Sequence, residues 1–126
     1  MVDGPSFTIP SRPQRNYPFS GGLEYEGGTT FELVPGGEWN TSQLETLLAS
    51  VLSEGPYRYG DFLNLPMTLY LVKDQQTGDV FRVSIRDGNV RLHVLPETNS
   101  EGLRALYRRL TEATDTEWNV TVTVEQ

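Results

Sequence analysis

The chain of 126 residues has no cysteine and only one histidine, His93. Without cysteine it cannot form disulfides, thiolate zinc sites or iron–sulfur clusters, and it has no thiol nucleophile. A single histidine also excludes a multi-histidine metal site within one chain. We therefore expect no metal and no cofactor.

Long apolar runs are missing as well. No stretch approaches the roughly 20 residues that a membrane-spanning helix needs. The first residues, Met-Val-Asp-Gly-Pro, show neither the basic region nor the apolar region of a secretory signal. We expect a cytoplasmic protein that does not enter a membrane.

Basic residues are few and almost all are arginine. Seventeen Asp and Glu face ten Lys and Arg, which gives a net charge of −7, and Lys73 is the one lysine. Such a balance argues against nonspecific nucleic-acid binding and against anionic membranes. Either the codon bias of a GC-rich genome or adaptation to high salt would produce this composition, and the sequence leaves both open. The charge is uneven, since residues 16–57 contain six Glu and no basic residue.

Known catalytic motifs are also missing. The sequence contains no H-E-x-x-H, G-x-S-x-G, Walker A or G-x-G-x-x-G pattern. No catalytic residue is therefore assigned, and the balance favours a protein that is not an enzyme.

Proline and glycine divide the chain into two parts. Residues 1–22 contain four prolines without periodicity, which predicts an extended or disordered tail. Residues 23–126 are predicted to form a single domain.

Periodicity within this domain predicts two helices and five strands. The strands are expected at 29–34, 67–73, 80–86, 90–95 and 118–124, with apolar helical stripes at 44–52 and 103–110. Three residues before the first stripe are N-cap candidates, namely Asn40, Thr41 and Ser42. Ser42 with Glu45 and Thr98 with Glu101 have the spacing of capping boxes. Asp87-Gly88 predicts a two-residue turn that sets Ile85 opposite Val90.

The element order is therefore β-α-β-β-β-α-β. Two helices with one apolar stripe each require a shared apolar sheet face. The predicted fold is a two-layer α+β domain, with an antiparallel sheet of four to five strands and both helices on one face.

Two groups of residues are candidates for binding. The first is the sheet face expected to point away from the helices, and its members are Tyr70, Arg82, Arg86, Arg91 and His93. The second lies in the segment 56–66, expected to be an irregular loop, and its members are Tyr57, Arg58, Tyr59, Asp61 and Phe62. Arginine and tyrosine are favoured at interfaces, and loops often carry binding residues.

These features favour an interaction or adaptor module whose contact surface is the arginine-bearing sheet face. The expected partner is another protein or a second copy of the chain, as a homodimer. The alternative is a domain, or a minor enzyme, that binds a small molecule or anion in a pocket under the loop 57–62.

Overall fold

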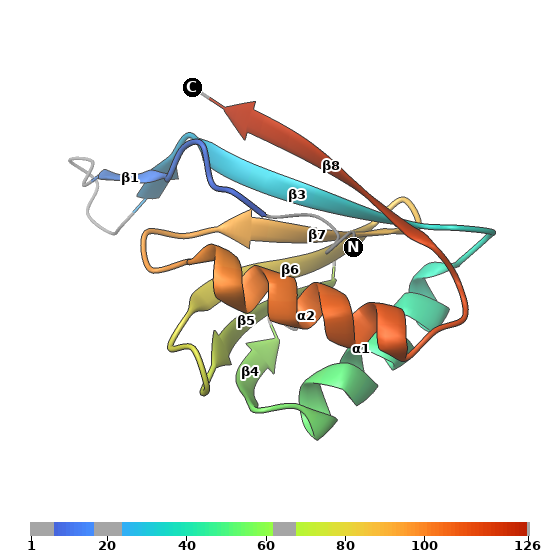
Figure 1. Cartoon of the computed structure of the whole chain (residues 1–126). Coiled ribbons are helices and arrows are strands. Elements are labelled where there is room, and N and C mark those ends of the chain that lie inside the picture. The colour runs from blue at the N-terminus through green and yellow to red at the C-terminus, as the bar shows by residue number, and fades with distance from the viewer. Residues whose placement is uncertain (1–6, 17–23, 62–67, 126) are drawn as a thin grey trace, which may run out of the picture.

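The computed structural model describes residues 7–16, 24–61 and 68–125 (Figure 1). Phe62, a candidate residue of the predicted loop, lies outside these residues. Six strands form one antiparallel sheet in the order β4-β5-β6-β7-β3-β8. Their bounds are Gly28–Pro35 (β3), Tyr57–Asp61 (β4), Thr68–Asp74 (β5), Val80–Arg86 (β6), Asn89–Val94 (β7) and Trp118–Glu125 (β8).

Both helices cover the same face of this sheet, as Figure 1 shows, so the predicted two-layer α+β fold is confirmed. Helix α1 (Thr41–Glu54) and helix α2 (Ser100–Glu112) bury the predicted leucine stripes. These side chains meet the inward residues of the strands, including Phe31, Phe81 and Leu92, which are 1% exposed or less.

The sheet has one strand more than the sequence predicted. Tyr57–Asp61, expected as an irregular loop, forms the edge strand β4, which pairs with β5. Its aromatic side chains alternate with Arg58 and Gly60, and such alternation suits a strand with one buried face.

The turn between β6 and β7 confirms the predicted register. Ile85 lies opposite Val90, and Val83 lies opposite Leu92. Asp87 and Gly88 both have positive φ, +54° and +76°, as a type I′ turn requires.

Both predicted capping boxes are wrong, but Asn40, one of the three predicted N-cap candidates of the first helix, is confirmed as its N-cap. Asn40 caps α1: its side chain accepts a hydrogen bond from the Gln43 amide (2.8 Å), and the Gln43 side chain accepts one from the Asn40 amide (3.0 Å). The helix thus begins two residues before the position that the pair Ser42 and Glu45 implied.

Helix α2 is capped from another part of the chain. Its N-cap residue Asn99 forms no side-chain cap, and Thr98 bonds to Val80 and Leu95 instead. The buried carboxylate of Asp79 accepts the Gly102 amide (2.6 Å) and the Asn99 side-chain amide (2.9 Å). A carboxylate at a helix N-terminus is favoured by the helix dipole, so Asp79 ties α2 to the start of β6.

Part of the N-terminal segment lies against the domain. The ring of Phe7 packs edge-on against Phe31 (5.0 Å) and Tyr107 (5.5 Å), and the Arg12 guanidinium donates to the Thr98 carbonyl (2.8 Å). Further along, β1 (Gln14–Asn16) pairs with β2 (Glu24–Glu26) in a separate two-stranded ladder. Neither α1 nor α2 is long and apolar enough to cross a membrane, and the described residues contain no other helix.

Candidate functional site

The sheet face turned away from the helices carries most of the predicted binding residues. Arg82, Arg86, Arg91 and His93 all occupy outward positions on β6 and β7, and Arg82 lies directly opposite His93. These four residues are therefore brought together as expected.

Tyr70 does not belong to this face, so its predicted position was wrong. It lies opposite Val83, which points to the helices, and it packs edge-on against Tyr59 at 6.1 Å. In the hairpin of β5 and β6 the Asp74 amide donates to the Asp79 carbonyl, so the loop consists of the four residues 75–78. With a loop of this length, the even-numbered outward residues of β6 lie opposite odd-numbered residues of β5. Leu69, Leu71 and Lys73 therefore point outward instead of Tyr70.

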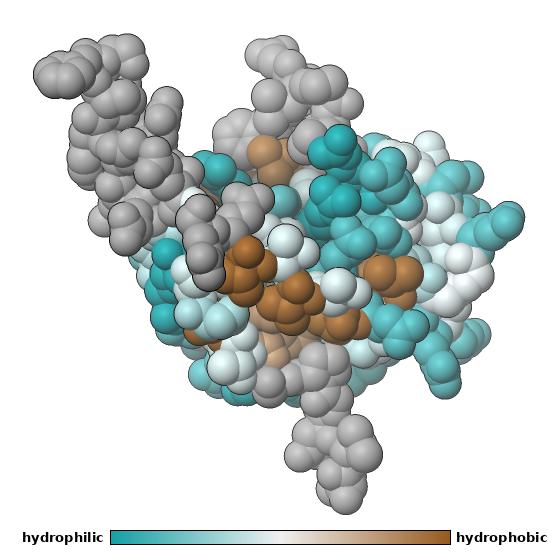
Figure 2. Space-filling model, turned by 90° about the horizontal axis from the view of Figure 1, so that it is seen from above, coloured by the Kyte–Doolittle hydropathy of each residue, from teal (hydrophilic) through white to brown (hydrophobic). Residues whose placement is uncertain are grey.

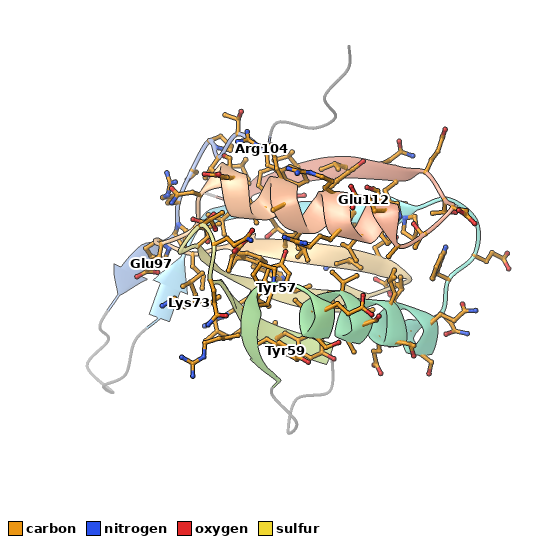
Figure 3. The ribbon with its side chains drawn as sticks, turned by 60° about the horizontal axis from the view of Figure 1, so that its bottom comes forward. Tyr57, Tyr59, Lys73, Glu97, Arg104 and Glu112 are labelled. Atoms are coloured by element: carbon orange, nitrogen blue, oxygen red, sulfur yellow. The ribbon has the colours of Figure 1, made fainter. Side chains whose placement is uncertain are left out.

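The second candidate group is split between the two faces of the sheet. Arg58 points outward opposite Lys73, whereas Tyr57 and Tyr59 point to the helix side (Figure 3). Asp61 ends β4 opposite Tyr70.

We call the outward positions of β4 to β7 the basic face. They carry five cationic side chains and no carboxylate: Arg58, Lys73, Arg82, Arg86 and Arg91. Sequence reasoning assigned Arg58 to the second candidate group, because β4 was taken for a loop, and it missed Lys73, because β5 was assigned the opposite facing. The apolar run 69–72 gives no alternation that would have corrected the facing of β5.

Two contacts fix the centre of the basic face. The Arg91 Nε donates to Glu32 Oε2 on the neighbouring strand β3 at 2.7 Å, and both side chains are less than a third exposed. Asn89 donates to the other oxygen of Glu32 (3.3 Å). Arg91 is thus held in place by a charge-assisted bond, which is stronger than a bond between neutral groups.

The second contact joins Ser84 Oγ to His93 Nε2 at 2.7 Å. Burial lowers the pKa of His93 from its ordinary value of 6.5, and the charges of Arg82 and Arg91 lower it further. The imidazole is therefore neutral at pH 7, and its Nε2 accepts the Ser84 hydroxyl when the proton sits on Nδ1. Ser84 is 3% exposed, so its hydroxyl is covered and serves to hold the ring.

A groove of about 550 Å³ opens beside this centre. Its walls include Pro13, Glu32, Leu69, Arg82, Arg91 and His93. The groove thus combines two cationic side chains, the Glu32 carboxylate paired with one of them, and neutral polar and apolar groups, a combination that orients a ligand.

Tyr57, from the second group, belongs to the core. It is 8% exposed, and the Arg109 guanidinium lies 5.7 Å from the centre of its ring. Burial raises the pKa of its hydroxyl, and Arg109 offsets part of that rise. The side chain closes the β4 end of the core against the helices. The predicted binding pocket under residues 57–62 stays a prediction.

No group of three or more His, Asp or Glu close enough to hold a metal ion occurs among the described residues. No known protein family, curated protein sequence or solved structure matches the chain.

Proposed function

We propose that the protein is an interaction module that uses the basic face to bind an acidic segment of a partner protein. One observation carries the proposal: four adjacent strands present five cations and no carboxylate outward, in a chain of net charge −7. Charge complementarity of this kind selects partners and speeds their association.

The spread of the cations favours a segment over a single small anion. Neighbouring strands are about 4.8 Å apart, so the cations from β4 to β7 extend over roughly 14 Å. One phosphate or carboxylate reaches two of them, whereas an extended acidic segment reaches them all. Leu71, which is 40% exposed and lies between Gly60 on β4 and Arg82 on β6, offers an apolar contact for the same segment.

The fixed centre of the face supports recognition of one orientation. Arg91 and His93 are both held by hydrogen bonds to their neighbours, so little side-chain entropy is lost when a partner docks against them. Arg58, Lys73 and Arg86 are exposed, and they supply attraction that salt screens.

Fluorescence anisotropy with a labelled, glutamate-rich peptide containing interspersed leucines tests the proposal. The wild-type protein should bind this peptide and release it as KCl is raised, and it should not bind the same peptide with glutamine in place of glutamate. Substituting Arg82→Gln and Arg86→Gln together should weaken binding about tenfold or more, because each charge-assisted bond contributes about 1.5–3 kcal/mol.

The double substitution of Arg104→Gln with Arg108→Gln is the matched control, since it likewise removes two positive charges, here from the exposed surface of α2. It should leave the affinity nearly unchanged. Equal loss of binding in the two variants would show that net charge alone attracts the peptide. Thermal unfolding of each variant separates loss of binding from loss of the fold.

A small anion is the second candidate ligand, and the groove is the observation that favours it. Arg82, Arg91 and His93 line one concavity, and guanidinium pairs recognise phosphate and carboxylate oxygens. Inorganic phosphate as the probe discriminates the two ligands. Saturable shifts of the His93 ring signals by phosphate, without binding of the acidic peptide, would favour the small anion.

A further inference from the structure

Strand β8 forms one edge of the six-stranded sheet. It pairs with β3 along its whole length, from Trp118 opposite Pro35 to Glu125 opposite Gly28. On its other side, no strand pairs with it within residues 7–16, 24–61 and 68–125. An edge of this kind presents backbone donors and acceptors that another strand can use.

The alternation of an antiparallel ladder identifies these backbone groups. Arg86 and Asn89 flank the two-residue turn and so exchange hydrogen bonds, and each strand then alternates between its two neighbours. In β7 the even-numbered residues therefore bond to β3, and in β3 the even-numbered residues bond to the odd-numbered residues of β8. The N–H and C=O groups of the even-numbered residues of β8 are left at the open edge. The carbonyl of Trp118 accepts the Tyr107 hydroxyl (3.1 Å), which leaves Val120, Val122 and Val124 facing outward.

This edge has none of the usual protection against pairing. From Asn119 to Val124 it has no proline and no charged residue, only a strict alternation of Val and Thr after Asn119. Soluble proteins commonly place lysine, proline or a bulge on such strands. Val122 and Val124 are also 48% and 41% exposed, although they lie on the helix side of the sheet.

Apolar residues also gather on the β8 side of the molecule. Figure 2, which looks down on the β8 side of Figure 1, shows hydrophobic residues in a row across the middle of this view, among more hydrophilic ones. A groove of about 580 Å³ has Phe7, Tyr107, Trp118, Val120 and Val122 in its walls.

We propose that β8 pairs with the β8 of a second copy of this chain, antiparallel and with Val122 on the two-fold axis. In this register Val122 lies opposite Val122 of the partner subunit, and Val120 lies opposite Val124 of the partner subunit. The outward backbone groups of all three valines then exchange hydrogen bonds, and β-branched side chains meet on both faces.

The charges at the ends of β8 favour this register over its neighbour. Centring the pair on Thr121 would set Glu117 opposite Glu125 of the partner subunit, and like charges directly opposite each other are destabilising. Centring it on Val122 sets Glu125 opposite Asn119 of the partner subunit instead. A pair centred on Thr123 would join only residues 121–125 of the strand, so the register centred on Val122 also joins more of β8.

A two-fold axis perpendicular to the sheet would join the two sheets into one of twelve strands and place both basic faces on the same side. The dimer would then present two copies of the surface assigned above to a partner. The pairing itself does not rest on that function, and it is tested separately.

Sedimentation velocity over a concentration series is the first test, in high KCl so that the charge of −7 per chain is screened. The wild-type protein should shift to the dimer mass as its concentration rises. Val122→Lys should remain at the monomer mass, because it places two ammonium groups on the axis. Tyr59→Lys, on the opposite edge strand and similarly exposed (42%), should dimerise like the wild type.

A thiol tests the register and does not depend on the folding of the lysine variant. Because the chain has no cysteine, Val122→Cys introduces a single thiol, whose partner thiol would lie across the axis at a Cα separation near 5.5 Å. Mild oxidation should convert this variant to a covalent dimer. Val124→Cys is the control, since its two thiols would be four positions apart, about 13 Å.

Three outcomes would overturn the inference. A wild-type protein that stays monomeric throughout the series has no such interface. Loss of the dimer in Tyr59→Lys but not in Val122→Lys would place the interface on β4. Equal cross-linking at 122 and 124 would exclude the proposed register. None of these outcomes bears on whether the basic face binds the acidic peptide.

Discussion

At the scale of single residues, His93 reports on the electrostatics of the basic face. Its side chain is partly buried opposite Arg82, and this burial together with the charges of Arg82 and Arg91 lowers its pKa below 6.5. In the unfolded chain His93 keeps its ordinary pKa. At a pH between the native and the unfolded pKa, the unfolded chain therefore binds more protons than the native protein. The free energy of unfolding is therefore unaffected by His93 above pH 6.5, and it decreases as the pH falls from 6.5 toward the native pKa.

We expect an NMR titration of the imidazole C–H signals to give a midpoint below 6.5. The assignment needs no mutants, because the chain has one histidine. His93→Gln should flatten the fall in unfolding free energy between about pH 6.5 and the native midpoint. A midpoint at or above 6.5 would mean that the arginines do not act on the ring as described.

Gly102 in α2 is the second residue whose role is specific. Alanine is the better helix former by about 1 kcal/mol, so propensity alone predicts that Gly102→Ala stabilises the protein. A Cβ at this position would overlap the Asp79 carboxylate that caps the helix. We expect Gly102→Ala to lower the free energy of unfolding by about 1–3 kcal/mol, as overpacking does.

Urea denaturation measures that change. Ala105→Gly in the same helix is the comparison, and it should cost about 1 kcal/mol from propensity alone. A variant Gly102→Ala as stable as the wild type would show that Asp79 moves aside without loss.

At the scale of elements, the β6–β7 hairpin sets the geometry of the basic face. Gly88 has a φ of +76°, and an added Cβ would lie 3.0 Å from the Trp39 carbonyl oxygen. Gly78, with a φ of +81°, has nothing within 4 Å of such a Cβ. Both substitutions to alanine carry the strain of positive φ, about 1–2 kcal/mol, and only Gly88 adds a contact.

Gly88→Ala should therefore lower the unfolding free energy more than Gly78→Ala does. Thermal or urea unfolding of the two variants checks the order. Equal losses would assign the whole effect to backbone strain and none to the contact with Trp39.

The elements also show where sequence reasoning succeeded and where it failed. The β6–β7 register was predictable because a two-residue turn and paired apolar residues allow only one alignment. The N-cap of α1 is local, and Asn40 was among its predicted candidates. The cap of α2 was not predictable, because Asp79 reaches that helix from 23 residues away. The predicted facing of β5 was wrong because its apolar run lacks alternation and the sequence does not show how many residues form the loop between β5 and β6.

At the scale of the whole molecule, the net charge of −7 hides a division between surfaces. The acidic residues that dominate the sequence lie largely outside the outward positions of β4 to β7, which collect half of the ten basic residues. Periodicity identified three of the five cations. Arg58 and Lys73 required the pairing of β4 with β5, a long-range contact that no local pattern encodes.

Mapping the acidic peptide on the folded protein tests this account most directly. Titration of the glutamate-rich peptide into isotopically labelled protein, followed by two-dimensional amide NMR, identifies the residues whose environment changes. We expect the largest shifts on β5, β6 and β7, centred on Leu71, Arg82 and Arg91, with the His93 ring responding in parallel. No shifts, or shifts confined to α1 and α2, would contradict the assignment of the basic face as the binding surface.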